Sequence, residues 1–284
     1  MRWLPWIAVL FGLGGCSGEF VLTAPDVVAL PEQNTAMIVR LQRSELGRYA
    51  PPCADVCLTV RLGQGQLQAA RTDSAGYAVL YLAGAQPGRY GLEIEHVDLT
   101  GDRALGKSNL YVLAPDKPIT AVDLDSLPRS GLAGADAAAA LRRLEGKTQW
   151  IYVTQEFAQS PAQARRWMAA LNYPDGPVVP VRRWALMQNA GTGQTISTLR
   201  NRLPLLTYGL AADQAGTRTL KAAGLQVLYV GKAPPPVAVY GRFAYWKDLD
   251  LAATAAPAAK APAASQPATA AASSQPASRE GPQE

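Results

Sequence analysis

The hydrophobic pattern of this 284-residue chain changes its period near residue 116, and this change most constrains the fold. Upstream, short segments alternate apolar and polar side chains or form brief apolar runs, as antiparallel strands do. Downstream, apolar runs of strand length alternate with segments of helical periodicity. We therefore expect two domains, an all-β unit over residues 20–115 and an α/β unit over residues 116–248. With 48% hydrophobic residues, the chain has enough apolar side chains for a core in each.

The first unit shows a series of strand-like segments without helical periodicity between them. Strands are predicted over residues 37–41, 58–62, 77–82, 90–95 and 109–113. The run Thr-Asp-Ser-Ala-Gly-Tyr-Ala at 72–78 and the later Pro-Gly-Arg-Tyr at 87–90 resemble the turns of bacterial immunoglobulin-like modules. This resemblance implies an immunoglobulin-like β-sandwich, a type of module that usually serves as a spacer or an adhesive unit.

The second unit alternates strands and helices. Strands are predicted over residues 119–122, 149–154, 177–181, 205–210 and 226–230. Helices are predicted over residues 134–144, 161–171, 196–203 and 214–223, and Ser160-Pro161 suits the start of the second of these. Five strands alternating with four helices predict a Rossmann-like parallel sheet with helices on both faces.

Polar side chains stand where several of these strands end. Asp123 and Asp125 follow the first strand, Thr154 ends the second, and Asp213 follows the fourth. Because ligands of open α/β sheets bind at the carboxyl ends of the strands, we expect these residues to meet at one rim. Carboxylate and hydroxyl oxygens are hard ligands that suit Mg²⁺.

This arrangement resembles the haloacid-dehalogenase-like (HAD-like) superfamily of mostly Mg²⁺-dependent phosphatases, and among them the phosphatidate-phosphatase-like, lipin-type branch. The resemblance covers about 110 residues and rests on the order of Asp-x-Asp, Thr154 and Gly-x-x-x-Asp. It implies that Asp123 attacks phosphorus and that Asp125 is the general acid and base. Thr154 would bind the phosphoryl group. Mg²⁺ would be held by Asp123, Asp125 and Asp213, with the Leu124 carbonyl.

The chain also departs from the family pattern. Ser126 and Leu127 follow Asp-x-Asp where the family usually has Gly or Asp and then Thr or Val. The family's phosphate-binding lysine has no counterpart, since no lysine lies between residues 147 and 221, and Arg200 or Arg202 is nearest to its place. Two functions therefore remain open. One is an active phosphatase for a phosphorylated small molecule or a lipid phosphate; the other is a degenerate module that binds or scaffolds an envelope partner.

The N-terminus predicts export. Arg2 precedes an apolar segment at 3–13, which is too short to span a bilayer as a helix, and Leu13-Gly14-Gly15-Cys16 follows. This run resembles the lipobox of bacterial lipoproteins, which implies a signal peptide over residues 1–16 and lipidation of Cys16. Ser17 then implies a cell-envelope protein anchored in the outer membrane and facing the periplasm. An ordinary signal peptide with a coincidental cysteine is the alternative.

Export and composition lead to three further predictions. In an oxidising compartment, Cys53 and Cys57 would most simply form a disulfide. Residues 249–284 are rich in Ala, Pro, Ser and Gln, and such a segment is expected to be a disordered tail, either a spacer or cell-wall contact or a solubilising extension. The net charge of +5 is spread along the chain without a basic run, so we expect no nucleic-acid partner.

Overall fold

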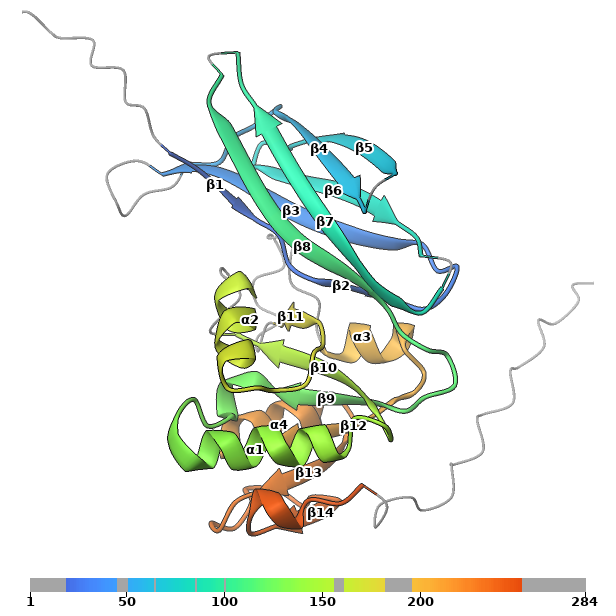
Figure 1. Ribbon diagram of the computed structural model, residues 1–284, viewed down its shortest axis with the longest axis vertical. Helices are drawn as coiled ribbons and strands as arrows, with labels where there is room; N and C mark the ends of the chain where they lie inside the picture. Colours follow the sequence, from blue (N-terminus) through green and yellow to red (C-terminus); the bar gives the residue numbers. More distant parts are fainter. Residues whose placement is uncertain are drawn as a thin grey trace, which may run out of the picture.

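The computed structural model describes residues 19–44, 51–63, 65–84, 86–99, 101–155, 161–181 and 196–251. These residues form a β-sandwich stacked end to end on an α/β unit (Figure 1). The predicted signal peptide with Cys16, and the tail beyond residue 251, lie outside the described residues.

The sandwich consists of two sheets. One has the strand order β1-β3-β6, and its members are β1 (Glu19–Thr23), β3 (Thr35–Ser44) and β6 (Tyr77–Leu82). The other has the order β2-β8-β7-β4-β5, and its members are β2 (Val27–Ala29), β4 (Cys57–Leu62), β5 (Gln66–Arg71), β7 (Gly88–Val97) and β8 (Arg103–Val112). All pairings are antiparallel except that of β2 with β8. Alternate side chains such as Val39, Leu58 and Ile94 point inward and form the buried core between the sheets.

The α/β unit contains a parallel sheet with the strand order β11-β10-β9-β12-β13-β14. Its strands are β9 (Ile119–Asp123), β10 (Gln149–Thr154), β11 (Val178–Pro180), β12 (Leu206–Ala211), β13 (Gln226–Val230) and β14 (Gly241–Phe243). Its helices are α1 (Gly131–Arg143), α2 (Pro161–Ala170), α3 (Ile196–Arg202) and α4 (Gln214–Ala222), with the 3₁₀ turns η1 (Leu124–Ser126) and η2 (Trp246–Asp248).

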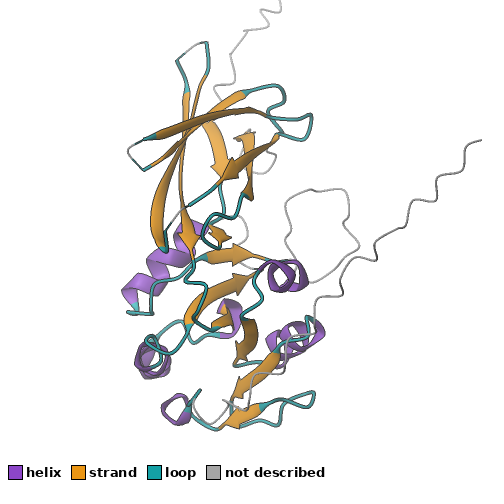
Figure 2. Cartoon of the chain, turned by 90° about the vertical axis from the view of Figure 1, so that its right-hand side faces the viewer, coloured by secondary structure: helices purple, strands orange, loops and turns teal. Residues whose placement is uncertain are grey.

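Helices cover both faces of this sheet (Figure 2). On one face, residues of α1 and α2 such as Leu141 and Met168 pack with Val122 and Tyr152 of the strands. On the other face, α3 and α4 pack with alternate strand residues such as Ala121 and Ile151. Each central strand thus buries both of its faces, which is why these strands read as continuous apolar runs in the sequence.

A buried ion pair joins the two units. The Asp26 side chain is fully buried and accepts hydrogen bonds from Arg165 Nη1 at 2.6 Å, from Val178 N at 2.9 Å and from Asn109 N at 3.0 Å. Val28 and Tyr111 of the sandwich, with Leu113 just after it, belong to the same apolar cluster as α3 and α4. The two units therefore share a core as well as a salt bridge.

The structure differs from the sequence prediction in its elements. The parallel sheet has six strands, because β14 was not predicted, and the sandwich contains three further strands, β1, β2 and β5. Leu249, assigned to the tail by composition, is buried against the α/β core, so the folded unit continues into the range predicted as tail. The N-terminal unit is nevertheless a β-sandwich, and a parallel sheet follows it, as predicted.

The predicted disulfide between Cys53 and Cys57 is not present, since both cysteines are free thiols. Cys53 is half-buried beside the sandwich core, whereas Cys57 begins β4 and is exposed, so the two side chains have different surroundings. The intervening turn is held by Thr72, whose hydroxyl donates to Cys53 O and accepts from Val56 N. Burial raises the pKa of the Cys53 thiol.

Among the described residues, no helix is both long and apolar enough to cross a membrane.

Candidate functional site

The predicted rim lies where the order of the parallel sheet reverses. The chain proceeds from β9 through β10 to β11 on one side of the sheet, then crosses back through α3 to β12 on the other side of β9. Asp123 is the last residue of β9, and Asp213 follows the end of β12, which is paired with β9. In open α/β sheets, ligands bind where such a reversal separates the carboxyl ends of two neighbouring strands, here β9 and β12. Asp123 and Asp213 lie at this edge of the sheet.

Asp123 is buried beneath the first turn of α4 and is 6% exposed. Its carboxylate lies so close to Gly216 that a Cβ atom added there would be 1.8 Å from Asp123 Oδ2 and 2.6 Å from Asp123 Cγ. Only glycine fits at residue 216 with the carboxylate in this position. The contact means that α4 covers the side chain predicted to be the nucleophile.

Asp125 is held by the end of β10. Thr154 Oγ1 donates a hydrogen bond to Asp125 Oδ1 at 2.5 Å, and the backbone N–H of Gln155 donates to Asp125 Oδ2 at 2.7 Å. The structure thus brings Asp125 and Thr154 together. Both carboxylate oxygens, however, accept hydrogen bonds from the chain itself, and the Thr154 hydroxyl is committed to Asp125.

Ser126 bridges the two strands on either side of the reversal. Its hydroxyl donates to the Asp123 carbonyl at 2.9 Å and accepts from Ala212 N at 3.0 Å. This side chain thus connects the turn after β9 with the end of β12. Ser126, which departs from the pattern of the HAD-like resemblance, therefore links the carboxyl ends of β9 and β12.

Asp213 is the N-cap of α4. Its Oδ1 accepts a hydrogen bond from Gly216 N at 2.7 Å, the usual bond of a helix-capping carboxylate. Thr217 strengthens the same turn, because its hydroxyl donates to Asp213 O. The side chain predicted to hold a metal ion is therefore part of the start of a helix.

The residues present do not fit the predicted Mg²⁺ site. A magnesium ion needs oxygen ligands arranged in near-octahedral geometry. In the part of the chain that the structure describes, no three His, Cys, Asp or Glu side chains gather closely enough to hold a metal ion. Asp125 accepts bonds from Thr154 and Gln155 while Asp213 caps α4, so these carboxylates already serve internal hydrogen bonds.

The structure does not bring Arg200 and Arg202 to the rim. Both lie at the end of α3, which precedes β12 and so approaches the opposite, amino-terminal edge of the sheet. Arg200 Nη1 donates to Ala223 O, just before β13. Arg202 Nη2 donates to Val28 O at 2.8 Å in the sandwich, and its burial lowers the pKa of its guanidinium. Both arginines thus support the packing between elements.

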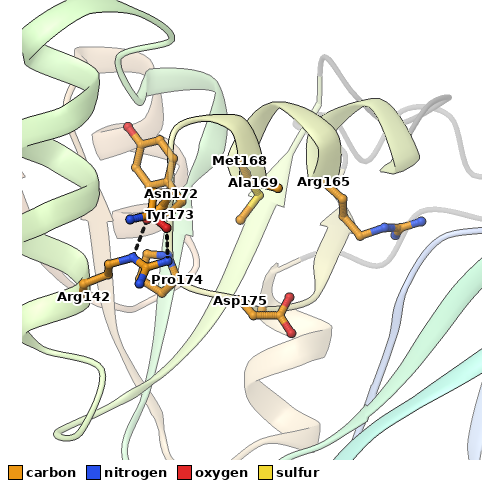
Figure 3. A pocket seen from close by; sticks show the side chains of 9 residues that line it. Arg142, Arg165, Met168, Ala169, Asn172, Tyr173, Pro174 and Asp175 are labelled. Carbon is orange, nitrogen blue, oxygen red and sulfur yellow. Dashed lines mark hydrogen bonds between the residues drawn. The ribbon is translucent and has the colours of Figure 1, made fainter.

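A hollow of about 250 Å³ lies elsewhere, beside α2 at the junction of the two units (Figure 3). Arg142, on α1, is bonded to the side chain and carbonyl of Asn172. Asp175 accepts hydrogen bonds from Arg89 Nη1 and from the Tyr111 hydroxyl of the sandwich, both at 3.1 Å. Asp175 therefore bonds to the sandwich, whereas Arg142 has its partner within the α/β unit, and the hollow lies beside the interface between the two units.

Sequence reasoning missed two residues that decide the geometry of the rim. Gly216 could have been noticed as a glycine in the first turn of a predicted helix, a place where a close backbone approach explains an otherwise unfavourable residue. In the sequence, Ser126 stands out only because it differs from the residue that the HAD-like pattern has after Asp-x-Asp. Its bond to Ala212 joins positions 86 residues apart, which no local pattern reveals.

No protein-family model matches the chain, and no curated protein matches it in sequence. Solved structures with similarity include the PKD domain of an M14-like peptidase from a Thermoplasmatales archaeon, with 11% identity over 34% of this chain and 93% of that chain and a TM-score of 0.26. The PKD domain of human SorCS2 has 14% identity over 35% and 76%, with a TM-score of 0.26. A Photobacterium 2,6-sialyltransferase has 12% identity over 72% of this chain but 41% of its own, with a TM-score of 0.22.

Proposed function

We propose that this protein is a lipid-anchored envelope protein whose α/β domain derives from a HAD-like phosphatase fold but serves as a binding or scaffolding module. Counted from β9, the strand order of the sheet is 3-2-1-4-5-6, the order of doubly wound nucleotide-binding folds. The positions of Asp123, Asp125, Thr154 and Asp213 at one rim add to this support. A tether at Cys16 places the module in the envelope.

One observation carries the non-catalytic part of the proposal, namely that the polar groups of the rim serve the fold. Asp125 accepts two bonds from the end of β10, Asp213 caps α4, and Ser126 joins β9 to β12. A phosphatase needs a nucleophile that reaches phosphorus and a general acid that faces the leaving oxygen. Here α4 covers the carboxylate of Asp123 at Gly216, and Asp125 is turned to Thr154.

The competing function is Mg²⁺-dependent hydrolysis of a phosphomonoester. To separate the two, purified protein lacking residues 1–16 is incubated with an aryl phosphate and with phosphatidate, in Mg²⁺ and in EDTA. We expect phosphate release no greater than that of Asp123→Asn protein under either condition. Saturable, Mg²⁺-dependent release that Asp123→Asn abolishes would overturn the proposal. Circular dichroism of both proteins checks that each is folded.

A further inference from the structure

An apolar cluster projects from the end of the β7–β8 hairpin. Val97, Leu99 and Leu105 are 48%, 107% and 69% exposed. His96 and Ala104 point into the sandwich, so the alternation of the two strands turns Val97 and Leu105 outward on the same face. A single exposed leucine is ordinary on a protein surface. Two leucines and a valine gather at this hairpin end, with Leu99 at the tip. The charged residues opposite Val97 and Leu105 are Arg103 and Glu95, which pair with each other at 3.8 Å.

The first strand of the fold begins at the same end of the sandwich. The Phe20 ring lies edge-on to His96 near the hairpin tip, with ring centroids 5.1 Å apart. Two residues further along β1, the Leu22 side chain packs over Gly106 of the hairpin. β1 starts at Glu19, only three residues after Cys16. Three residues span about 10 Å when extended, so an anchor at Cys16 cannot lie far from this end.

The α/β unit occupies the opposite end of the sandwich. β8 runs from Arg103 beside the hairpin tip to Val112, and Leu113, the next residue, packs into the α/β core. Ten residues of strand are about 34 Å long. The fold therefore separates two ends: one carries the apolar hairpin and the start of β1, and the other carries the α/β unit (Figure 1).

We propose that the hairpin end of the sandwich docks on the membrane, with Val97, Leu99 and Leu105 inserted into the interfacial layer beside the lipid anchor. This inference rests on the proposed anchor at Cys16, because a tether supplies the proximity that three side chains alone would not provide. The same turn carries Asp98 and Asp102, whose charges oppose a strongly anionic surface. The partner that fits is therefore a largely zwitterionic lipid surface.

The test replaces the acyl chains with a defined tether. Residues 1–16 are exchanged for a polyhistidine tag, which keeps every described residue, and the protein is bound to phosphatidylcholine vesicles that contain a nickel-chelating lipid. Leu99→Trp is compared with Leu132→Trp, a matched control because Leu132 is 85% exposed on α1 in the other unit. Brominated phosphatidylcholine then reports which of the two added tryptophans touches the acyl chains.

Four native tryptophans remain, so each variant is compared with the parent protein. We expect the fluorescence added by Leu99→Trp to be blue-shifted and to lose intensity with brominated lipid, while that added by Leu132→Trp does neither. Equal behaviour of the two positions would overturn the proposal. A second copy of the chain is the other occupant to exclude: a dimer in analytical ultracentrifugation that Leu99→Ser dissociates would also overturn it. The artificial tether makes this result independent of acylation, which is tested separately by the mass of the mature protein and of its Cys16→Ser variant.

Discussion

At the scale of single residues, the contact between Asp123 and Gly216 defines the state of the rim. The carboxylate occupies the space in which any larger residue at 216 would place its Cβ. A catalytic carboxylate would instead have to face the crevice. From the sequence alone, Asp123 can also be interpreted as a nucleophile, because a local motif shows neither the burial of its side chain nor its contact with α4.

This contact predicts a coupled effect on stability. Gly216→Ala should lower the free energy of unfolding by about 1–3 kcal/mol, because the added methyl group overpacks the site. Asp123→Ala removes the clashing atoms, so the double variant should be more stable than the sum of the single effects predicts. Urea denaturation of the four proteins measures the coupling. Additive effects would show that the two side chains do not meet as described.

At the scale of elements, the start of α4 shows what Asp213 does. Its side chain satisfies the N–H of Gly216, one of the orphan donors of the first helical turn. We expect Asp213→Ala to lower stability by about 1 kcal/mol, and Asp213→Ser to retain most of it, because serine also caps helices. Thermal denaturation with Mg²⁺ or with EDTA provides the control. A melting temperature that rises with Mg²⁺ in the parent but not in Asp213→Ala would point to a metal ligand instead.

The elements also show how far sequence reasoning extends. The buried strands at Ile119–Asp123, Gln149–Thr154 and Gln226–Val230 could be predicted because both of their faces are apolar. β14 could not, since Gly241–Phe243 is three residues long and carries an arginine. The rim residues could be assigned to the correct edge from chain order. Their hydrogen bonds could not be predicted, because they depend on contacts such as that between Ser126 and Ala212.

At the scale of the whole molecule, the interface between the sandwich and the α/β unit makes the stability of each unit depend on the other. Asp26 and Arg165 are 139 residues apart, and the ion pair between them is largely shielded from water. The hairpin end of the sandwich and the α/β unit lie at opposite ends of a strand about 34 Å long. On the proposed arrangement the sandwich is a spacer, and the rim would be held away from the lipid surface, which disfavours a lipid phosphate in the same membrane as its ligand.

The interface between the two units predicts that they unfold cooperatively. Scanning calorimetry should show one transition for both units, because they share an apolar core. Asp26→Ala should cost about 3–5 kcal/mol, since it leaves the largely shielded Arg165 and the buried N–H groups of Asn109 and Val178 without their acceptor. Arg71→Ala, which removes the exposed pair with Asp55, should cost no more than about 1 kcal/mol. Two separate transitions in the parent protein would contradict a shared core.

On the proposed function, the rim of the α/β unit is structural and not hydrolytic. The most direct test uses beryllium fluoride, which mimics a phosphoryl group on an aspartate and therefore needs no knowledge of the substrate. The melting temperature of the protein is measured with Mg²⁺ alone and with Mg²⁺ and beryllium fluoride, beside Asp123→Asn. We expect no difference between the two conditions. A rise that appears only with both reagents and vanishes in Asp123→Asn would mean that the site binds the analogue in its folded state and would contradict the account.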